Sequence, residues 1–324
     1  MQNPSTFKQQ LSSTYVDLMS DPGFKIVYGD RANKKLLIDL LNAVLPEEAE
    51  VDDIIEYRDR EQLKDTVYSK GSRMDLLCRG KDGRNYIVEV QRERCDPFFK
   101  RVMYYASGVY RNNLSEGDDY EQLTPVYVVG ILNFSLGHRD EDRWDTDNFI
   151  SHYEMVEKRT GEFASTVFSC NFAELSLFTK SVEECTSYRD LLFYWFKHSG
   201  KLDMLPEEVR RSPKMCELAK ACEKGSFTPE KKLEYESLMM NELDKINMIR
   251  QAERRALAKG QEKGEKLGLK KGRAEGERVG VEKGRASRNI EIARNMLAEG
   301  IEDSMIARFT GLTSEQVNEL KRAY

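Results

Sequence analysis

Histidine is scarce in this sequence. Only three occur among 324 residues, at His138, His152 and His198. Chemistry that needs several imidazoles, such as that of His-rich zinc hydrolases or paired-histidine phosphodiesterases, is therefore disfavoured. The six cysteines are scattered and no two are spaced C-x-x-C, so their spacing indicates neither a zinc site nor a disulfide framework. If the chain is an enzyme, its carboxylates must carry the chemistry.

Long apolar runs are also absent. No stretch of about 18 apolar residues exists, which excludes a transmembrane helix and a membrane partner. The first residues lack the basic-then-apolar pattern of a signal peptide, so we expect a cytoplasmic protein. Apolar residues make up 40% of the chain and charged residues 33%, which is typical of soluble proteins with a core. The length predicts two structural units.

Charge is distributed unevenly along the chain. Residues 250–324 carry 17 Lys and Arg against 12 Asp and Glu, a net charge of +5, whereas residues 1–249 carry 34 against 44, a net charge of -10. A basic tail on an acidic body favours nucleic-acid contact through the tail and a cation site in the body. A solvated helix would produce a similar tail.

The hydrophobic pattern of residues 1–200 predicts helices alternating with strands. In chain order, we expect a helix over 31–45, strands Asp53–Tyr57, Ser72–Cys78 and Tyr86–Gln91, a helix from Pro97 to about Asn113, a strand Pro125–Phe134, further strands within 150–180, and a helix Tyr188–Lys197. Asp82-Gly83 signals a hairpin between the second and third strands. The nearly continuous apolar run at 125–134 indicates a strand buried on both faces. The simplest packing is a mixed sheet flanked by helices.

Seven glycines recur at a strict four-residue spacing from Gly260 to Gly284. On a helix such a row drifts by about 40° per step and traces a winding groove. Each glycine costs about 0.8–1.0 kcal/mol relative to alanine, so the segment is a poor lone helix. Either a partner helix packs into the groove, or the segment is a charged flexible tether. Pairing in a membrane is excluded because Lys, Glu and Arg lie between the glycines.

The last block, Ser287–Tyr324, predicts three short helices. The first ends at Gly300, the second covers Glu302–Phe309, and the third is capped by Thr313. A helix, a glycine-containing turn and a helix form the outline of a helix-turn-helix unit. A small helical oligomerisation unit fits the same pattern.

Two acidic residues stand out on the predicted hairpin. Strand alternation places Asp75 on the face opposite Met74 and Leu76, while Glu89 and Gln91 share one face of the next strand. Linked strands would then present Asp75, Glu89 and Gln91 side by side.

Two carboxylates with a backbone carbonyl between them, that of Val90, provide hard oxygen ligands suited to Mg²⁺ or Mn²⁺. Such an ion activates a bound water and screens the charge of a phosphate, while Gln91 could orient that water. Two simpler interpretations of these residues do not involve a metal site. In the first, the acidic residues are only the solvent-facing half of an alternating strand. In the second, the Glu-Val-Gln stretch pairs with Arg92 or Arg94 and has no further role.

These residues belong to a longer series of motifs. In chain order the series is Asp21-x-x-Phe24-Lys25 with Gly29, Leu41-Asn42-x-x-Leu45, Asp75, Asp82-Gly83-Arg84 and Glu89-Val90-Gln91. It resembles the PD-(D/E)XK nuclease family transposases, also called the Rpn family of recombination-promoting nucleases. The glycine repeat and the closing helical unit resemble tails common in that family. The resemblance covers nearly the whole chain and implies an α/β, restriction-endonuclease-like PD-(D/E)XK core with an α-helical C-terminal extension.

The resemblance implies roles for individual residues. Asp75 and Glu89 match the metal-binding acidic residues, and the Val90 carbonyl completes a site for Mg²⁺, with Mn²⁺ or Ca²⁺ as substitutes. Gln91 stands where the wider superfamily has lysine, which removes a cation and predicts slow turnover. Lys25 could contact a DNA phosphate. Asp21 could approach the metal or cap the leading helix.

The leading hypothesis is thus a metal-dependent DNA endonuclease acting on double-stranded DNA in recombination, mobile-element biology or defence against foreign DNA. The alternatives are a catalytically weak or inactive DNA-binding or regulatory protein, and a ribonuclease. We expect a nuclease-like domain over 1–200, a helical connector over 201–249, the glycine-repeat segment over 250–286 and the small helical unit over 287–324. The tail would bind nucleic acid through basic residues such as Lys270, Lys271 and Arg273, and would form a homodimer or a higher homo-oligomer.

Overall fold

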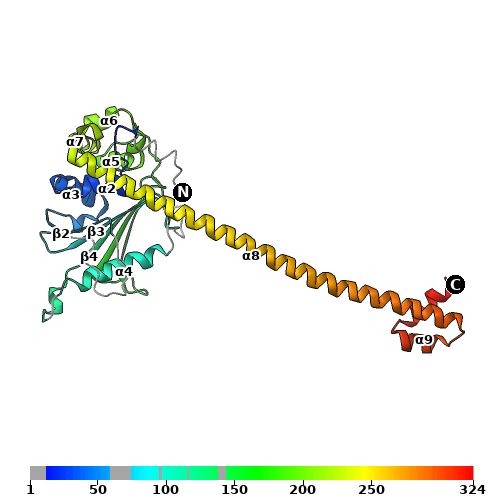
Figure 1. Cartoon of the computed structure of the whole chain (residues 1–324). Coiled ribbons are helices and arrows are strands. Elements are labelled where there is room, and N and C mark those ends of the chain that lie inside the picture. Colours follow the sequence, from blue (N-terminus) through cyan, green and yellow to red (C-terminus); the bar gives the residue numbers. More distant parts are fainter. Residues whose placement is uncertain (1–11, 59–73, 95–96, 115–116, 138–143, 324) are drawn as a thin grey trace. The chain divides into compact units, whose positions relative to one another are not determined.

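The computed structural model describes residues 12–58, 74–94, 97–114, 117–137 and 144–323. The chain divides into two compact units, residues 1–246 and 247–324. One helix, α8 (Pro229–Ala298), begins in the first unit and ends in the second. Figure 1 shows the elements of each unit.

A six-stranded mixed sheet forms the centre of the first unit, in the order β1-β2-β3-β4-β6-β5. The strands are β1 (Ile54–Tyr57), β2 (Leu76–Gly80), β3 (Asn85–Gln91), β4 (Val126–Leu132), β5 (Ile150–Val156) and β6 (Phe163–Glu174). Strands β1, β2 and β3 are antiparallel neighbours, β3, β4 and β6 run parallel, and β5 pairs antiparallel with β6. The parallel step from β3 to β4 passes through helix α4 (Phe98–Arg111).

Helices cover both faces of this sheet (Figure 1). On one face lie α2 (Asp21–Tyr28), α3 (Lys34–Val44), α5 (Tyr188–His198), α6 (Glu207–Arg211), α7 (Pro213–Cys222) and the start of α8. This larger core contains the fully buried rings of Phe24, Tyr28, Phe193, Trp195 and Phe196. The predicted mixed sheet flanked by helices is confirmed.

Helix α4 covers the opposite face. Its side chains Phe98 and Val102 pack with Leu77, Ile87 and Phe172 of the sheet in a second core. Every residue of β4 is buried, because helices lie on both of its faces. The predicted strand buried on both sides is thus confirmed for residues 126–132, whereas Asn133 is exposed.

The hairpin of β2 and β3 differs from the prediction at both ends. Asp75 lies at a bend just before β2 instead of inside a strand, and residues 72–73 lie outside the described residues. The reason is that the Asp75 carboxylate, and not a backbone carbonyl, accepts the N–H of Val90 at 2.8 Å. At the other end β2 continues to Gly80, and Gly83 closes the turn with a φ of 83°.

The bend also changes which face each neighbour occupies. Met74 packs in the core under α4, whereas Leu76 packs in the larger core on the other face. The prediction that Met74 and Leu76 share a face is wrong, because strict alternation holds only within a regular strand.

Three helix segments form a small core in the second unit. Ala293 of α8, Ile306 of α9 (Asp303–Thr310) and Val317 of α10 (Ser314–Arg322) are fully buried together. Gly311 ends α9 with a φ of 69°, and Thr313 caps α10 by accepting the N–H of Gln316. Gly311 lies in the predicted break between the last two helices, and Thr313 is the predicted cap of the last one.

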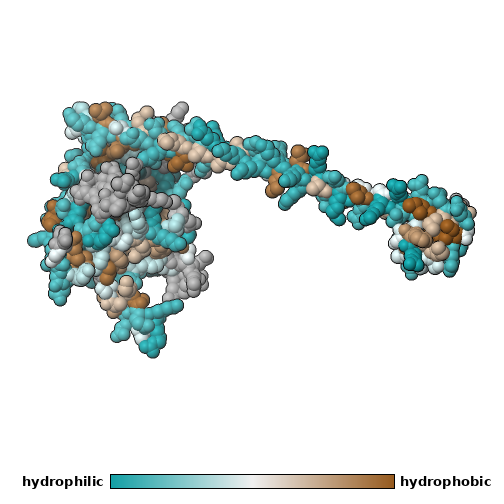
Figure 2. All heavy atoms as spheres, turned by 60° about the horizontal axis from the view of Figure 1, so that its bottom comes forward, coloured by the Kyte–Doolittle hydropathy of each residue, from teal (hydrophilic) through white to brown (hydrophobic). Residues whose placement is uncertain are grey.

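The glycine repeat is helical throughout, as part of α8. A Cβ atom added at any of the seven glycines, from Gly260 to Gly284, would meet nothing within 4 Å. Figure 2 shows mainly hydrophilic atoms along this part of α8, interrupted by separate hydrophobic patches; exposed apolar side chains here include Leu257, Leu267, Leu269 and Val281. A partner helix in the groove stays a prediction. Among the described helices, none is both long and apolar enough to cross a bilayer.

Candidate active site

Asp75 is tied to the end of β3 by the bond between its Oδ2 and the backbone N–H of Val90. The antiparallel register pairs Leu76 with Val88 and Leu77 with Ile87. Continuing this register by one residue brings Asp75 opposite Glu89. The structure thus places the two predicted carboxylate residues as neighbours at one end of the hairpin.

Glu89 is buried, with 3% of its surface exposed. Its Oε2 accepts a hydrogen bond from Nε2 of Gln91 at 3.2 Å, while its Oε1 has no hydrogen-bond partner among the described residues. The alternative of a solvent-facing glutamate on an alternating strand is therefore wrong for Glu89. Arg92 does not pair with it either, because the Arg92 guanidinium binds Asp17 at 2.5 Å.

Both carboxyl groups hold their protons more tightly than usual. Burial raises the pKa of Asp75 to about 6, against the lowering effect of the Val90 N–H, and neighbouring Asp21 adds to the rise. Burial and then the charge of Asp75 raise the pKa of Glu89 well above its ordinary value, while the charge of Arg101 on α4 acts in the opposite direction. Two adjacent buried carboxylates with incomplete compensation favour a bound cation.

The raised pKa of Asp75 predicts that the free energy of unfolding, measured in EDTA, depends on pH. Because folding raises the pKa of Asp75, the wild type is expected to lose stability as the pH rises through about 6. Asp75→Asn keeps an oxygen for the Val90 N–H but cannot ionise. At pH 8 this variant should be more stable than the wild type by roughly 3 kcal/mol, and at pH 4 the difference should nearly disappear.

Thermal unfolding in EDTA at both pH values measures this effect, with Asp82→Asn at the hairpin turn as the control. An Asp75→Asn advantage of equal size at pH 4 and pH 8 would contradict the pKa assignment.

A pocket of about 210 Å³ opens beside Asp75. Its lining consists of Met19, Ser20, Asp21, Pro22, Asp75, Val90, Gln91, Arg92, Met239 and Glu242. The structure thus gathers Asp75, Gln91, Val90 and Asp21 around one space. Glu89 is not part of that lining and lies on the α4 side, where it contacts Gln91.

Asp21 and Lys25 both lie on α2, and Asp21 lines this pocket. Ser20, and not Asp21, caps the helix, because its Oγ accepts the N–H of Gly23 at 3.1 Å. The suggestion that Asp21 is the cap is therefore wrong. Asp21 forms an ion pair with Lys25 one turn later, so both predicted accessory residues stand next to the site.

The donor set fits a hard divalent cation. No three His, Cys, Asp or Glu side chains are placed to share a metal ion within the described ranges. The predicted set is smaller, consisting of the Asp75 and Glu89 carboxylates and the Val90 carbonyl. The unpartnered, buried Oε1 of Glu89 is an oxygen ligand of the type that Mg²⁺ and Mn²⁺ prefer.

Comparison with known families decides the identity of the first unit. The model of the PD-(D/E)XK nuclease family transposases matches residues 18–252, which is most of the chain. The chain belongs to this family. A comparison with curated proteins and one with solved structures return no match.

A second family model matches the end of the chain. The C-terminal helix-turn-helix domain of the Rpn/YhgA-like nuclease family matches residues 287–322. The match coincides with the small core of α8, α9 and α10. Of the two interpretations of this block, a helix-turn-helix unit and an oligomerisation unit, the first is confirmed.

Sequence reasoning missed several residues of the site. Arg101 lies three residues after the buried Phe98 on α4, so its position on the sheet-facing side was visible in the helical spacing. Nothing in the sequence pointed to Met239 or Glu242, which reach the pocket from a segment predicted to be a connector. The predicted DNA-binding residues Lys270, Lys271 and Arg273 lie on the exposed part of α8 in the second unit.

Proposed function

We propose that this family member is a metal-dependent DNA endonuclease that hydrolyses phosphodiester bonds. The observation that supports the proposal is the arrangement of Asp75 on the Val90 N–H beside the buried Glu89, whose Oε1 has no partner among the described residues. Two neighbouring carboxylates with raised pKa values, of which Asp75 lines a pocket, are typical of catalytic sites.

Asp75, Glu89 and the carbonyl of Val90 would hold the ion, with Mg²⁺ as the expected metal and Mn²⁺ or Ca²⁺ as substitutes. When bound, a divalent ion lowers the pKa of a coordinated water and offsets the charge of the phosphate. Gln91 donates its amide N–H to Glu89, which leaves the amide oxygen free to accept a hydrogen bond from an attacking water and so to orient it. Because Gln91 is neutral, it cannot stabilise the charge that develops on the phosphate, and slow turnover follows.

The second unit would bring the nuclease to double-stranded DNA. Its helix-turn-helix supports DNA contact, and the exposed cations Lys270, Lys271 and Arg273 would bind phosphates. The open glycine groove supports a homodimer or a higher homo-oligomer formed through α8. Cleavage of both strands of a duplex needs two active sites or two visits, so paired nuclease units fit the activity. Recombination, mobile-element biology or defence against foreign DNA is the expected setting.

A second candidate is a catalytically weak or inactive DNA-binding or regulatory protein, and the neutral Gln91 favours it. Incubation of the full-length protein with supercoiled plasmid in Mg²⁺, Mn²⁺, Ca²⁺ or EDTA separates the two. We expect nicked and linear products with Mg²⁺ or Mn²⁺ and none in EDTA. Intact plasmid under all conditions, together with plasmid binding, would support the second candidate. A parallel reaction with RNA tests the ribonuclease alternative.

A further inference from the structure

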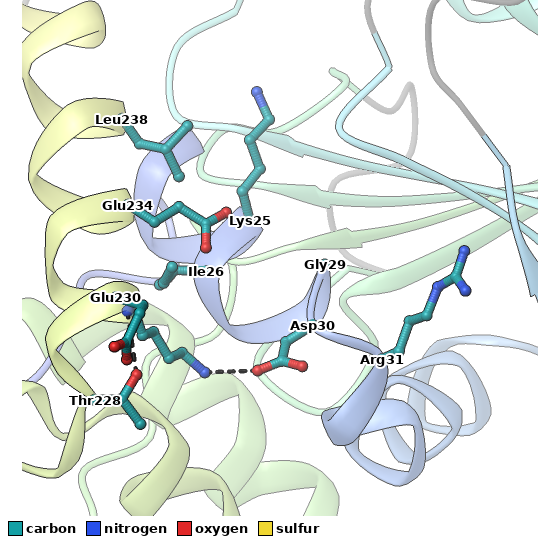
Figure 3. A pocket seen from close by; sticks show the side chains of 10 residues that line it. Lys25, Ile26, Gly29, Asp30, Arg31, Thr228, Glu230, Glu234 and Leu238 are labelled. Carbon is teal, nitrogen blue, oxygen red and sulfur yellow. Dashed lines mark hydrogen bonds and ion pairs between the residues drawn. The ribbon is translucent and has the colours of Figure 1, made fainter.

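The first turns of α8 belong to the nuclease unit. Tyr235 and Met239 are 3% and 2% exposed and lie in its larger core. Lys231 forms an ion pair of 2.8 Å with Asp30, just after α2. Figure 3 shows the cavity beside it, lined by Lys25 and Ile26 of α2 and by Glu234 and Leu238 of α8. The family match also continues into α8, to residue 252. This part of α8 is therefore not a simple connector.

The same turns bring an ammonium group to the candidate active site. Met239 and Glu242 line the pocket that contains Asp75 and Gln91. Nζ of Lys245 lies 3.3 Å from Oε2 of Glu242 and 3.6 Å from Oδ2 of Asp21. Both Glu242 and Asp21 line the pocket, so Lys245 stands at its rim.

Asp21 thereby holds two lysines from different helices. Its Oδ1 pairs with Lys25 of α2 and its Oδ2 with Lys245 of α8. Arg92, the other cation at the pocket, is engaged by Asp17. A phosphate that enters the pocket comes close to the carboxylates of Asp75, Asp21 and Glu242, which repel it. The positive charge of the nearby ammonium groups opposes this repulsion.

Lys245 is suited to exchange partners. Its side chain is 47% exposed, and exposed ion pairs of lysine contribute little free energy. A long, flexible side chain can turn from Asp21 toward a phosphate oxygen without a rearrangement of the helix. Glu242, three residues earlier on the same helix, keeps the ammonium group at the rim.

We propose that Lys245 is a phosphate-binding residue of the nuclease site, and that with Lys25 it supplies the positive charge that Gln91 does not. The proposal rests on the proposed function. It makes the start of α8 an active-site element, positioned by Met239 and Glu242. The ligand is the phosphodiester of the strand that is cleaved.

The first test is single-turnover cleavage of a short DNA duplex by full-length Lys245→Ala in Mn²⁺. We expect a loss of about tenfold or more in the second-order rate constant, the usual effect of losing a charged hydrogen bond, and substantial recovery in Lys245→Arg. Lys232→Ala is the matched control, because Lys232 is an exposed lysine of the same helix outside the pocket lining. Equal rates for Lys245→Ala and Lys232→Ala would overturn the proposal.

A second readout does not depend on turnover. Binding of a fluorescein-labelled dinucleotide in Ca²⁺, measured by anisotropy, reports on the pocket because a dinucleotide is too short for a helix-turn-helix site. We expect weaker binding by Lys245→Ala than by Lys232→Ala. If the wild type cleaves nothing but this difference is present, the endonuclease proposal fails and the phosphate site stands. If the two variants bind alike, or the wild type does not bind, the phosphate site is refuted.

Discussion

Asp75→Ala and Glu89→Ala are expected to reduce plasmid cleavage in Mg²⁺ or Mn²⁺ by roughly a thousandfold or more, to the level of the EDTA control. The reason is that each substitution removes one of the two carboxylates proposed to hold the ion. Gln91→Ala should reduce cleavage by only about tenfold, because a neutral amide can only orient a water or a carboxylate. Initial rates of nicking, measured at matched protein concentration, test the order of the three effects.

Two controls keep this experiment interpretable. Asp82→Ala removes a carboxylate from the far end of the same hairpin, at the turn, and should cleave like the wild type. Glu89→Gln retains the volume of a buried side chain and separates loss of the carboxylate from loss of packing. Undiminished cleavage by all of the Asp75, Glu89 and Gln91 variants would place the active site elsewhere in the chain.

Truncation after residue 249 is expected to lower both the oligomeric state and the DNA affinity. The truncated chain keeps the pocket residues but loses the glycine groove, the basic part of α8 and the helix-turn-helix unit. We expect a change from a dimer or higher oligomer to a monomer, and a loss of DNA affinity of at least tenfold at low salt. Light scattering and a DNA-binding titration across a salt series measure the two effects.

A variant with three substitutions separates the effect of the tail's charge on DNA binding from its effect on the oligomeric state. Replacement of Lys270, Lys271 and Arg273 by alanine should leave the oligomeric state unchanged. If all three contact phosphates, the slope of log affinity against log salt should become shallower by about 2 to 3 units. A truncated protein with the full-length oligomeric state and DNA affinity would mean that the tail is only a tether.

The sequence predicted the fold better than the details of the site. Strand periodicity and the Asp82-Gly83 turn placed the hairpin, and the apolar run placed β4, because these signals are local. The bend at Asp75 was not predictable, since it depends on a hydrogen bond that the N–H of Val90, fifteen residues away, donates to the Asp75 side chain. Alternation alone consequently misplaced Met74 and Leu76.

The α8 wall of the pocket was hidden for a related reason. Met239 and Glu242 are separated from Asp75 by more than 160 residues, and their part of α8 carries no motif that distinguishes it from a connecting helix. Which residues of a helix reach a distant pocket is decided by tertiary packing, here by the buried Tyr235 and Met239. Sequence periodicity reports which residues face inward but not what they face.

The bond from Val90 to Asp75 has a consequence for observing the site. A backbone amide proton that is held by a side chain exchanges with solvent when that side chain moves, even if the sheet stays intact. The Val90 amide is thus an internal reporter of the position of Asp75. Its exchange rate can be compared with that of the Val88 amide within the β2–β3 ladder. The comparison would report, in solution and without a label or substrate, whether the Asp75 carboxylate is in place.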